Sequence, residues 1–248
     1  MKSLRTIINA GKGFFLLLGH CKIFNPDIVF KNKRVAIIGS ADSALQEQNG
    51  EYLNGFDIVI RINKALVKWV PQNEDKIGMK TDILFHSFYE NDASGGGMLD
   101  FEVFKSHGVN FVVNPINTLK GKRLNFNFYK KYRNKCETYL LSKKYYSEME
   151  SLFGSLRPTI GFAAIYAVLK SPCKEVFITG FTFFRTPYAK GYRDALIDIK
   201  ANRSYIAQQA LHDPDLEFTS FIELLKSTAN KKILMDAALT KIVGAKQK

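Results

Sequence analysis

Short apolar runs recur along the chain between more polar stretches, a pattern that predicts buried strands. Most of the runs are rich in Val, Ile and Phe, and several end at Gly or just before Pro. Strands that are apolar on both faces are typical of a mostly parallel sheet covered by helices. The predicted strands are Lys33–Gly39, Phe56–Ile60, Thr81–Phe85, Asn110–Val113, Lys174–Gly180 and Lys232–Met235.

Helical patterns alternate with these strands. Apolar spacing predicts helices over Thr159–Lys170, Ile197–Gln209 and Asp213–Lys226. The last of them begins with Asp213 at a natural N-cap position and Pro214 at the first helical position. The alternation predicts an α/β domain with a mostly parallel sheet flanked by helices, which binds its ligand at the carboxyl ends of the strands. The 248 residues suffice for one such domain with appendages.

The charge is uneven. The chain holds 36 Lys and Arg against 23 Asp and Glu, a formal net charge of +13, and its 46% hydrophobic content excludes a disordered protein. Residues 1–34 carry a net charge of +6 and Lys120–Lys144 a net charge of +8. The remainder is close to neutral. This excess implies an acidic partner: nucleic acid, an anionic membrane surface or phosphorylated small molecules.

Residues 1–30 form a basic amphipathic segment, followed by the main domain over residues 31–248. The apolar run Phe14–Leu18 is too short for a membrane span, which needs about 20 apolar residues, and it is not followed by the small-residue cleavage pattern of a secretion signal. The segment can be an interfacial membrane helix or an ordinary terminal helix packed on the domain. The apolar side would hold Leu4, Ile7, Ile8, Phe14, Phe15 and Leu18, and the headgroup side Lys2, Arg5 and Lys12.

The cysteines indicate no metal site and no disulfide framework. Cys21, Cys136 and Cys173 are far apart, and none has the CxxC spacing of a zinc ligand pair. Three reduced thiols are typical of a cytosolic protein.

Polar groups follow the predicted strands. Gly39 and Ser40 form the turn after the first strand, where a glycine allows close backbone approach and a helix N-terminus favours phosphate. Neither GxGxxG nor GxxxxGK[ST] is present, so the dinucleotide fingerprint and the Walker motif are both excluded. Arg61 and Asn63 end the second strand, and Asn63 suits a base or a sugar hydroxyl unless both residues are structural. Thr159 and the N–H groups at its helix start could hold an anion or carboxylate, or simply cap the helix.

The run His212-Asp-Pro-Asp-Leu-Glu217 supplies a candidate base. A histidine beside carboxylates and a helix N-terminus can be held near its working pKa, as a general base requires. Asp213 and Asp215 also spell a DxD metal motif, but Asp213 reads better as a helix cap. His86, at the end of the third strand, is the alternative base. His20 and His107 have no supporting context.

Together these segments resemble the animal sialyltransferases, glycosyltransferase family 29. VAIIGSADSAL through FDIVIRINKA is similar to the large motif of the family, and Pro158–Phe181 to its small motif. Gly191–Asp194 is a weak match to the third motif, and His212–Glu217 fits the His-x4-Glu motif closely. The motifs lie in family order from Val35 to about residue 232. Bacterial sialyltransferases with a similar strand–Gly turn, Arg-x-Asn and late His support the same interpretation.

The resemblance implies a single-domain, GT-A-like (Rossmann-type) fold, a CMP-sugar donor, and no metal or other cofactor. It implies that His212 is the catalytic base and that Asn63 contacts the nucleotide. It further implies donor-binding roles for two turns and two tyrosines. Gly39 and Ser40 would line the ribose–phosphate turn, Thr159 and Gly161 would border the donor carboxylate or cytidine, and Tyr192 or Tyr188 would hydrogen-bond the leaving phosphate.

Four positions depart from the family pattern. Ser40 stands where Asn is usual, and Ile160 stands where a hydroxyl residue is usual. Gly191 replaces the histidine of the third motif. Val35 replaces the cysteine that pairs with the small-motif cysteine, so Cys173 lacks that partner. We expect no counterpart of the animal enzymes' membrane anchor and stem, and a cytosolic bacterial relative in a reducing compartment.

The expected activity is inverting, metal-independent transfer of sialic acid from CMP-sialic acid to a hydroxyl of a glycan or glycolipid, of the lipooligosaccharide or capsule type. The alternative donor is CMP-Kdo, because the motifs read CMP and a carboxylate alone. A catalytically inactive CMP-binding scaffold is a further alternative. The expected location is the inner face of the cell membrane, where the basic segments would meet anionic lipid and the acceptor would be lipid-linked.

A rival class is a nucleic-acid-binding protein. Lys120–Lys144 interleaves basic residues with aromatic ones, as single-strand binding requires. The basic residues nevertheless lie in one inserted region, no RNA-binding signature is present, and a charged solvated helix explains them as well. We therefore expect no nucleic-acid partner. Acceptor recognition is expected on Ser87–Leu99 and on Lys120–Lys144.

Overall fold

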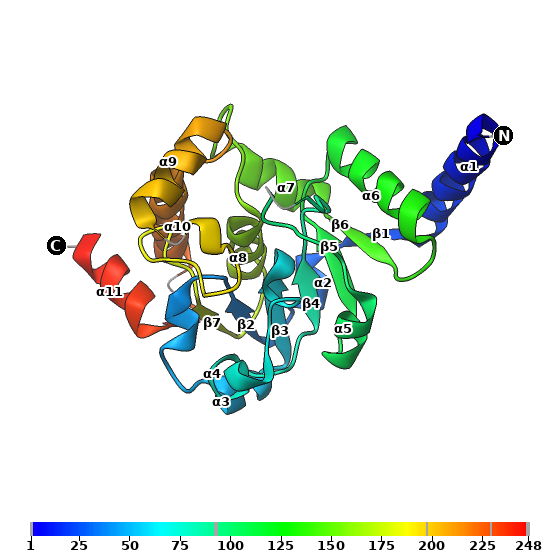
Figure 1. The fold of residues 1–248 in the computed structure, drawn as a ribbon. Coiled ribbons are helices and arrows are strands. Elements are labelled where there is room, and N and C mark those ends of the chain that lie inside the picture. The colour runs from blue at the N-terminus through cyan, green and yellow to red at the C-terminus, as the bar shows by residue number, and fades with distance from the viewer. Residues whose placement is uncertain (1, 92–93, 197, 229, 247–248) are drawn as a thin grey trace.

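The protein is described here by a computed structural model that covers residues 2–91, 94–196, 198–228 and 230–246. In these ranges one parallel sheet has the strand order β1-β6-β5-β4-β3-β2-β7-β8 (Figure 1). The strands are β1 (Cys21–Phe24), β2 (Arg34–Ile38), β3 (Ile58–Ile62), β4 (Ile83–Phe85), β5 (Phe111–Asn114), β6 (Thr138–Leu141), β7 (Glu175–Thr179) and β8 (Lys232–Met235).

Helices cover both faces of the sheet. Helices α7, α8 and α10 lie on one side, and α3, α4 and α5 on the other (Figure 1). The α-helices are α1 (Lys2–His20), α2 (Pro26–Val29), α3 (Gly50–Asn54), α4 (Glu74–Ile77), α5 (Phe101–Ser106), α6 (Leu119–Tyr132), α7 (Lys143–Glu150), α8 (Ile160–Lys170), α9 (Ile199–Gln209), α10 (Pro214–Ser227) and α11 (Ala237–Lys246). Short 3-10 turns are η1 (Asp42–Leu45), η2 (Asn63–Ala65), η3 (Pro71–Asn73) and η4 (Asp194–Leu196).

Successive side chains of a strand point to opposite faces of the sheet, so the core has a part on each face. In β2, Val35 and Ile37 pack into the cluster that includes α8 and α10, whereas Ala36 and Ile38 pack into the cluster on the α3 side. Both sets are almost fully buried. The sheet is therefore apolar on both faces, as the uninterrupted runs in the sequence predict.

All six predicted strands are present, and the expected single α/β domain with a mostly parallel sheet is confirmed. Two strands were not predicted, β1 and β6, which pair with each other at one edge of the sheet. Because β1 holds Cys21–Phe24, the sheet begins inside the segment 1–30 that the sequence set apart from the main domain. The predicted helix start at Ile197 lies outside the described residues; α9 begins at Ile199.

Asp213 is the N-cap of α10, as predicted. Its carboxylate accepts hydrogen bonds from the N–H groups of Asp215 (2.9 Å) and Leu216 (3.1 Å).

Within the described ranges, none of the helices is long and apolar enough to cross a bilayer.

Arg61 has a structural position rather than a ligand-binding one. Its side chain is fully buried, and it donates to Thr81 Oγ1 (2.9 Å), Ile77 O (2.7 Å) and Gly78 O (2.7 Å). Burial lowers the pKa of Arg61 to about 9. The guanidinium thus ties β3 to the turn at Gly78, which has φ +64°.

Candidate active site

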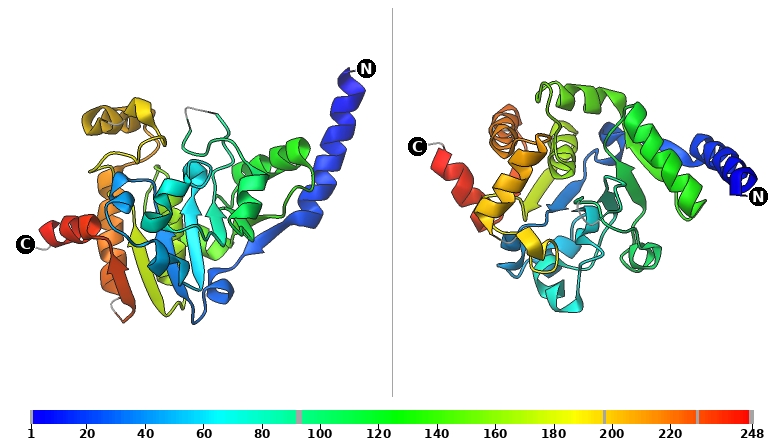
Figure 2. Two further views of the ribbon diagram at one scale, coloured as in Figure 1. Left: turned by 60° about the horizontal axis from the view of Figure 1, so that its bottom comes forward. Right: turned by 45° about the horizontal axis from the view of Figure 1, so that its top comes forward.

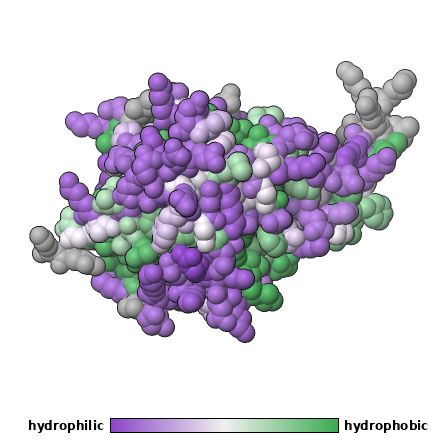
Figure 3. All heavy atoms as spheres, turned by 90° about the horizontal axis from the view of Figure 1, so that it is seen from below, coloured by the Kyte–Doolittle hydropathy of each residue, from purple (hydrophilic) through white to green (hydrophobic). Residues whose placement is uncertain are grey.

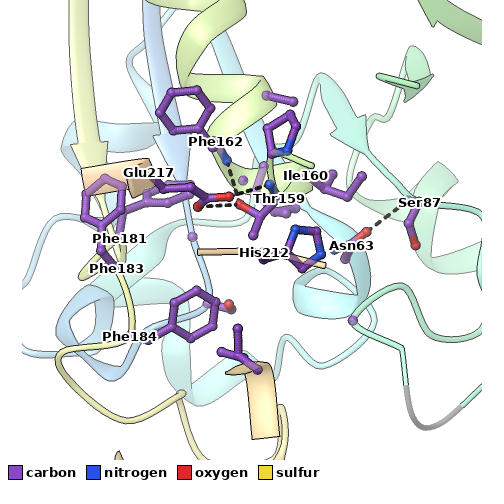
Figure 4. A pocket seen from close by; sticks show the side chains of 18 of the residues that line it. Asn63, Ser87, Thr159, Ile160, Phe162, Phe181, Phe183, Phe184, His212 and Glu217 are labelled. Carbon is purple, nitrogen blue, oxygen red and sulfur yellow. Dashed lines mark hydrogen bonds between the residues drawn. The ribbon is translucent and has the colours of Figure 1, made fainter. Parts of the chain in front are cut away.

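A pocket of about 540 Å³ lies at the carboxyl edge of the sheet (Figure 4). The chain leaves β2 toward β3 on one side and leaves β7 toward β8 on the other, so β2 and β7 flank the topological switch point. Open α/β sheets bind ligands at such a point. All eight predicted site residues line this pocket: Gly39, Ser40, Asn63, Thr159, Gly161, Tyr188, Tyr192 and His212.

The floor of the pocket depends on a glycine contact. A Cβ atom at Gly39 would lie 2.2 Å from the carbonyl oxygen of Gly180, which is closer than any side chain tolerates. The N–H of Gly39 donates to Thr179 O (2.8 Å), and that of Ala41 donates to Gly180 O (3.0 Å). Only glycine at position 39 lets the ends of β2 and β7 approach this closely.

Asn63 and Tyr192 form the polar side of the pocket. Asn63 is buried with φ +51°, and its Oδ1 accepts from the Ser87 N–H at 3.0 Å. Its amide nitrogen is therefore the group that can donate to a ligand. The Tyr192 hydroxyl donates to Gly95 O (3.2 Å) and also contacts the side chains of Ser40 and Asn63. Burial raises the pKa of Tyr192, so the phenol stays neutral and can donate.

Thr159 is hydrogen-bonded to Glu217, the last residue of the His212–Glu217 motif. Its Oγ1 accepts from the Phe162 N–H (3.1 Å) and so caps α8. Its N–H donates to Glu217 Oε1 (2.5 Å), and its hydroxyl pairs with Glu217 Oε2 (3.0 Å). Thr159 is therefore a helix cap, one of the two alternatives that the sequence left open, and its own N–H is engaged by Glu217 from α10. Ile160 and Gly161, in the first turn of α8, still line the pocket.

Glu217 is fully buried beside Thr159. Burial raises its pKa to about 8, so the group is mostly protonated near neutral pH. Glu217 accepts from the Thr159 N–H with one oxygen and from the Thr159 hydroxyl with the other. The pair therefore joins the starts of α8 and α10 without a buried charge.

His212 presents one ring nitrogen to the pocket. Nδ1 lies 2.6 Å from Arg157 O, and because a carbonyl can only accept, Nδ1 carries the proton in the neutral ring. Nε2, which has no hydrogen-bond partner among the described residues, then carries the lone pair. Burial lowers the pKa of His212, which keeps the ring neutral. In the view of Figure 4 the imidazole lies between Thr159 and Asn63.

The rival base His86 is engaged at both nitrogens. Its side chain is 1% exposed, Nε2 lies 2.9 Å from Gly96 O, and Nδ1 accepts from the Phe88 N–H at 2.9 Å. Burial lowers its pKa to about 4. His86 thus holds the loop after β4 and has no nitrogen left for a substrate proton.

The DxD residues are likewise occupied. Asp213 caps α10, and Asp215 pairs with Arg185 (3.1 Å) and Arg203 (2.5 Å). Within the described ranges, no group of three His, Cys, Asp or Glu side chains could hold a metal ion.

The sequence did not single out two features of the pocket. Phe181 and Phe184 line its apolar part, and Phe184 has φ +58°. Asn202 on α9 also lines the pocket; it is 2% exposed, and its Oδ1 has no hydrogen-bond partner among the described residues. Phe181 ends the small-motif match but was given no role there, and Phe184 and Asn202 lie outside the motifs, because each contributes through the path of its loop or helix.

A comparison of the sequence with models of known protein families identifies the family. The model of glycosyltransferase family 29 (sialyltransferase) matches residues 29–229. The chain belongs to this family. It is therefore a glycosyltransferase of the sialyltransferase family, as the sequence motifs predict.

Solved sialyltransferases share the fold. A mammalian sialyltransferase in complex with Gal-beta-1-3GalNAc-ortho-nitrophenol is 15% identical, with a TM-score of 0.56 over 91% of this chain and 78% of that one. The sialyltransferase CstII from Campylobacter jejuni, in complex with the substrate analogue CMP-3FNeuAc, is 13% identical, with a TM-score of 0.51 over 82% and 81%. A CstII variant in complex with CMP is 15% identical, with a TM-score of 0.52 over 82% and 81%. No match was found among curated proteins.

Proposed function

We propose that this family 29 chain is an inverting sialyltransferase that transfers sialic acid from CMP-sialic acid to a hydroxyl group of a glycan or glycolipid. The observation that carries the proposal is the His212 imidazole, which lines the same pocket as the seven predicted donor-binding residues and keeps Nε2 for a substrate. The CMP and CMP-3FNeuAc complexes of CstII support a CMP-sugar donor.

The donor would lie across the switch point. Asn63 would donate to the nucleotide, while Gly39 and Ser40 would follow its ribose and phosphate. The N–H groups in the first turn of α8, at Ile160 and Gly161, would face the sugar carboxylate, since a helix N-terminus favours an anion. Thr159, with its own donors bound to Glu217, would hold that turn in place.

His212 would act as general base. Nε2 takes the proton of the acceptor hydroxyl while that oxygen bonds to the anomeric carbon, and the bond from this carbon to the CMP phosphate breaks. The electron pair leaves with CMP. Hydrogen bonds from Tyr188 and Ser40, and from Tyr192 once its hydroxyl turns from Gly95 O to the ligand, would stabilise the growing charge on the phosphate. We propose that no metal takes part, because Asp213 and Asp215 are used by the helix cap and by two arginines.

Donor identity is the most useful test. We expect CMP release with an acceptor glycan to be at least about tenfold faster, in kcat/KM, from CMP-sialic acid than from CMP-Kdo. The apolar side chain of Ile160 at the carboxylate end is the feature that keeps CMP-Kdo as the second candidate. Incubation with each donor separately, with and without EDTA, measures both points. A preference for CMP-Kdo, CMP binding without turnover, or a loss of activity in EDTA that Mn²⁺ restores would each overturn the corresponding part of the proposal.

A further inference from the structure

Helix α1 is attached to the rest of the protein along one side. It projects from the β1 edge of the sheet and runs beside α6 (Figures 1 and 2). The contact is close at Gly13, where a Cβ atom would lie 3.1 Å from Lys130 Cγ. Arg133 Nη2 also donates to Asn9 Oδ1 at 2.6 Å. One face of α1 is thus fixed on the α6 region, and the other is available to a partner.

The outer face of α1 is apolar. Ile8, Phe15 and Leu18 are seven and three residues apart and so share one side of the helix, and they are 48%, 75% and 67% exposed. Phe14, at 52%, lies at the edge of this face. In the view of Figure 3, apolar surface appears beside hydrophilic surface at the end of the molecule where α1 projects. A group of large apolar side chains in water marks an interaction site.

Cationic groups lie directly beside this face. Lys12, Phe15, Leu16, Arg133 and Asn134 line a shallow groove between α1 and the end of α6. Arg133 Nη1 is buried there and has no hydrogen-bond partner among the described residues. A phosphate in the groove would pair with the exposed Lys12 and the Arg133 guanidinium, with Phe15 and Leu16 against the apolar part of the same ligand.

The net positive charge around α1 indicates which partner this face binds. The N-terminal 34 residues and Lys120–Lys144 carry net charges of +6 and +8. A second copy on this face would bring two such regions together, which like-charge repulsion opposes. A bilayer with anionic phospholipids offers both apolar chains and phosphates, and a basic amphipathic helix binds it through both terms.

We infer that the outer face of α1, with the Lys12–Arg133 groove, docks on an anionic phospholipid bilayer. Phe15 and Leu18 enter the boundary between headgroups and acyl chains, and Arg133 binds a lipid phosphate. In the left view of Figure 2, the N-terminal end of α1 points upward, toward the end of the molecule at which α9 lies. Residues of α9 line the pocket. Docking would therefore bring the pocket near the bilayer surface. This inference goes beyond the proposed reaction and is tested without it.

The test is co-sedimentation of the full chain with phosphatidylcholine vesicles, with and without phosphatidylglycerol. We expect binding that requires phosphatidylglycerol and that falls as salt rises. The double variant Phe15→Glu/Leu18→Glu should lose roughly tenfold or more in vesicle affinity, because it removes the apolar term and repels the lipid. The matched control Val70→Glu/Met79→Glu changes two residues of 44% and 43% exposure with the same charge change, far from α1, and should bind as the wild type does.

Three results would overturn the inference. The first is equal vesicle binding by the α1 variant and the control. The second is a wild-type chain that ignores both kinds of vesicle but forms a dimer that Phe15→Glu/Leu18→Glu dissolves, which would assign the face to a second copy. The third is tighter binding to a single-stranded oligonucleotide than to anionic vesicles. Circular dichroism of both variants, with CMP binding as a second check, separates loss of docking from loss of fold.

Discussion

Two histidines, His86 after β4 and His212 before α10, lie near the carboxyl ends of the strands. Burial lowers the pKa of both. They differ in what their ring nitrogens do. His86 donates or accepts at both nitrogens within the loop that follows β4. His212 uses only Nδ1, against Arg157 O, and faces the pocket with Nε2.

This difference separates a structural histidine from a catalytic one better than the pKa does. A lowered pKa keeps either ring neutral, but only a nitrogen without a protein partner can take a substrate proton. His86 and His212 both lie at strand or helix ends that the sequence associates with ligand binding. Their hydrogen bonds, and not their positions in the chain, assign the roles.

The largest effect on activity is expected for His212→Ala. A positioned general base contributes about 10² to 10⁴-fold to the rate, so kcat should fall by at least roughly 10²-fold. CMP binding, measured by calorimetry, should stay within about threefold of the wild type, since Nε2 acts on the acceptor. Near-normal turnover by His212→Ala would return His86 to consideration as the base.

Substitution of His86 should act on stability instead. The native pKa of about 4 lies below the unfolded value of 6.5, so this histidine contributes stability above pH 6.5 that is lost as pH falls through about 4. The shift corresponds to about 3 kcal/mol in full. Urea unfolding of wild type and His86→Ala at pH 7 and at pH 4.5 measures it: the difference between the two proteins should shrink at the lower pH. A difference that does not change with pH would contradict this role.

Glu217 offers a finer test of the His212 side of the pocket. Glu217→Ala removes the partner of the Thr159 N–H and hydroxyl, and we expect KM for the donor to rise by roughly tenfold. Glu217→Gln has the same shape as the protonated carboxyl that prevails below a pKa of about 8, and so should stay within about threefold at pH 7. Steady-state kinetics with varied CMP-sugar measures both. Equal KM values for the Ala and Gln variants would remove the positioning role of Glu217.

The sequence predicted the strands from β5 to β8 along the sheet but missed β1 and β6 at the other end. The central strands carry continuous apolar runs, and β2, for example, is buried along almost its whole length. The missed strands β1 and β6 have four residues each, and β1 exposes Lys22 and Ile23. They are strands because β6 pairs with β5 and β1 pairs with β6, a tertiary effect that no local pattern records.

The sequence predicted residues that line the pocket, but it did not predict the hydrogen bonds between them. Positions at strand and helix ends indicated Gly39, Ser40, Asn63, Thr159 and His212, since strand ends converge at one edge of a parallel sheet, and the family resemblance supplied Gly161, Tyr188 and Tyr192; all eight line the pocket. The pairing of Thr159 with Glu217, 58 residues apart, depends on how α10 packs against α8. The occupied nitrogens of His86 likewise depend on the path of the loop at Gly96. Both are decided by packing, which spacing along the chain does not encode.

The pH dependence of kcat/KM for sialyl transfer, in wild type and in both histidine variants, tests the central claim most directly. The base must be neutral, and burial holds the pKa of His212 below 6.5. The account therefore predicts that activity rises with pH through an apparent pKa below 6.5 and then levels off. The rising limb should be absent in His212→Ala and unchanged in His86→Ala. A limb that persists in His212→Ala, or that disappears in His86→Ala, would contradict it.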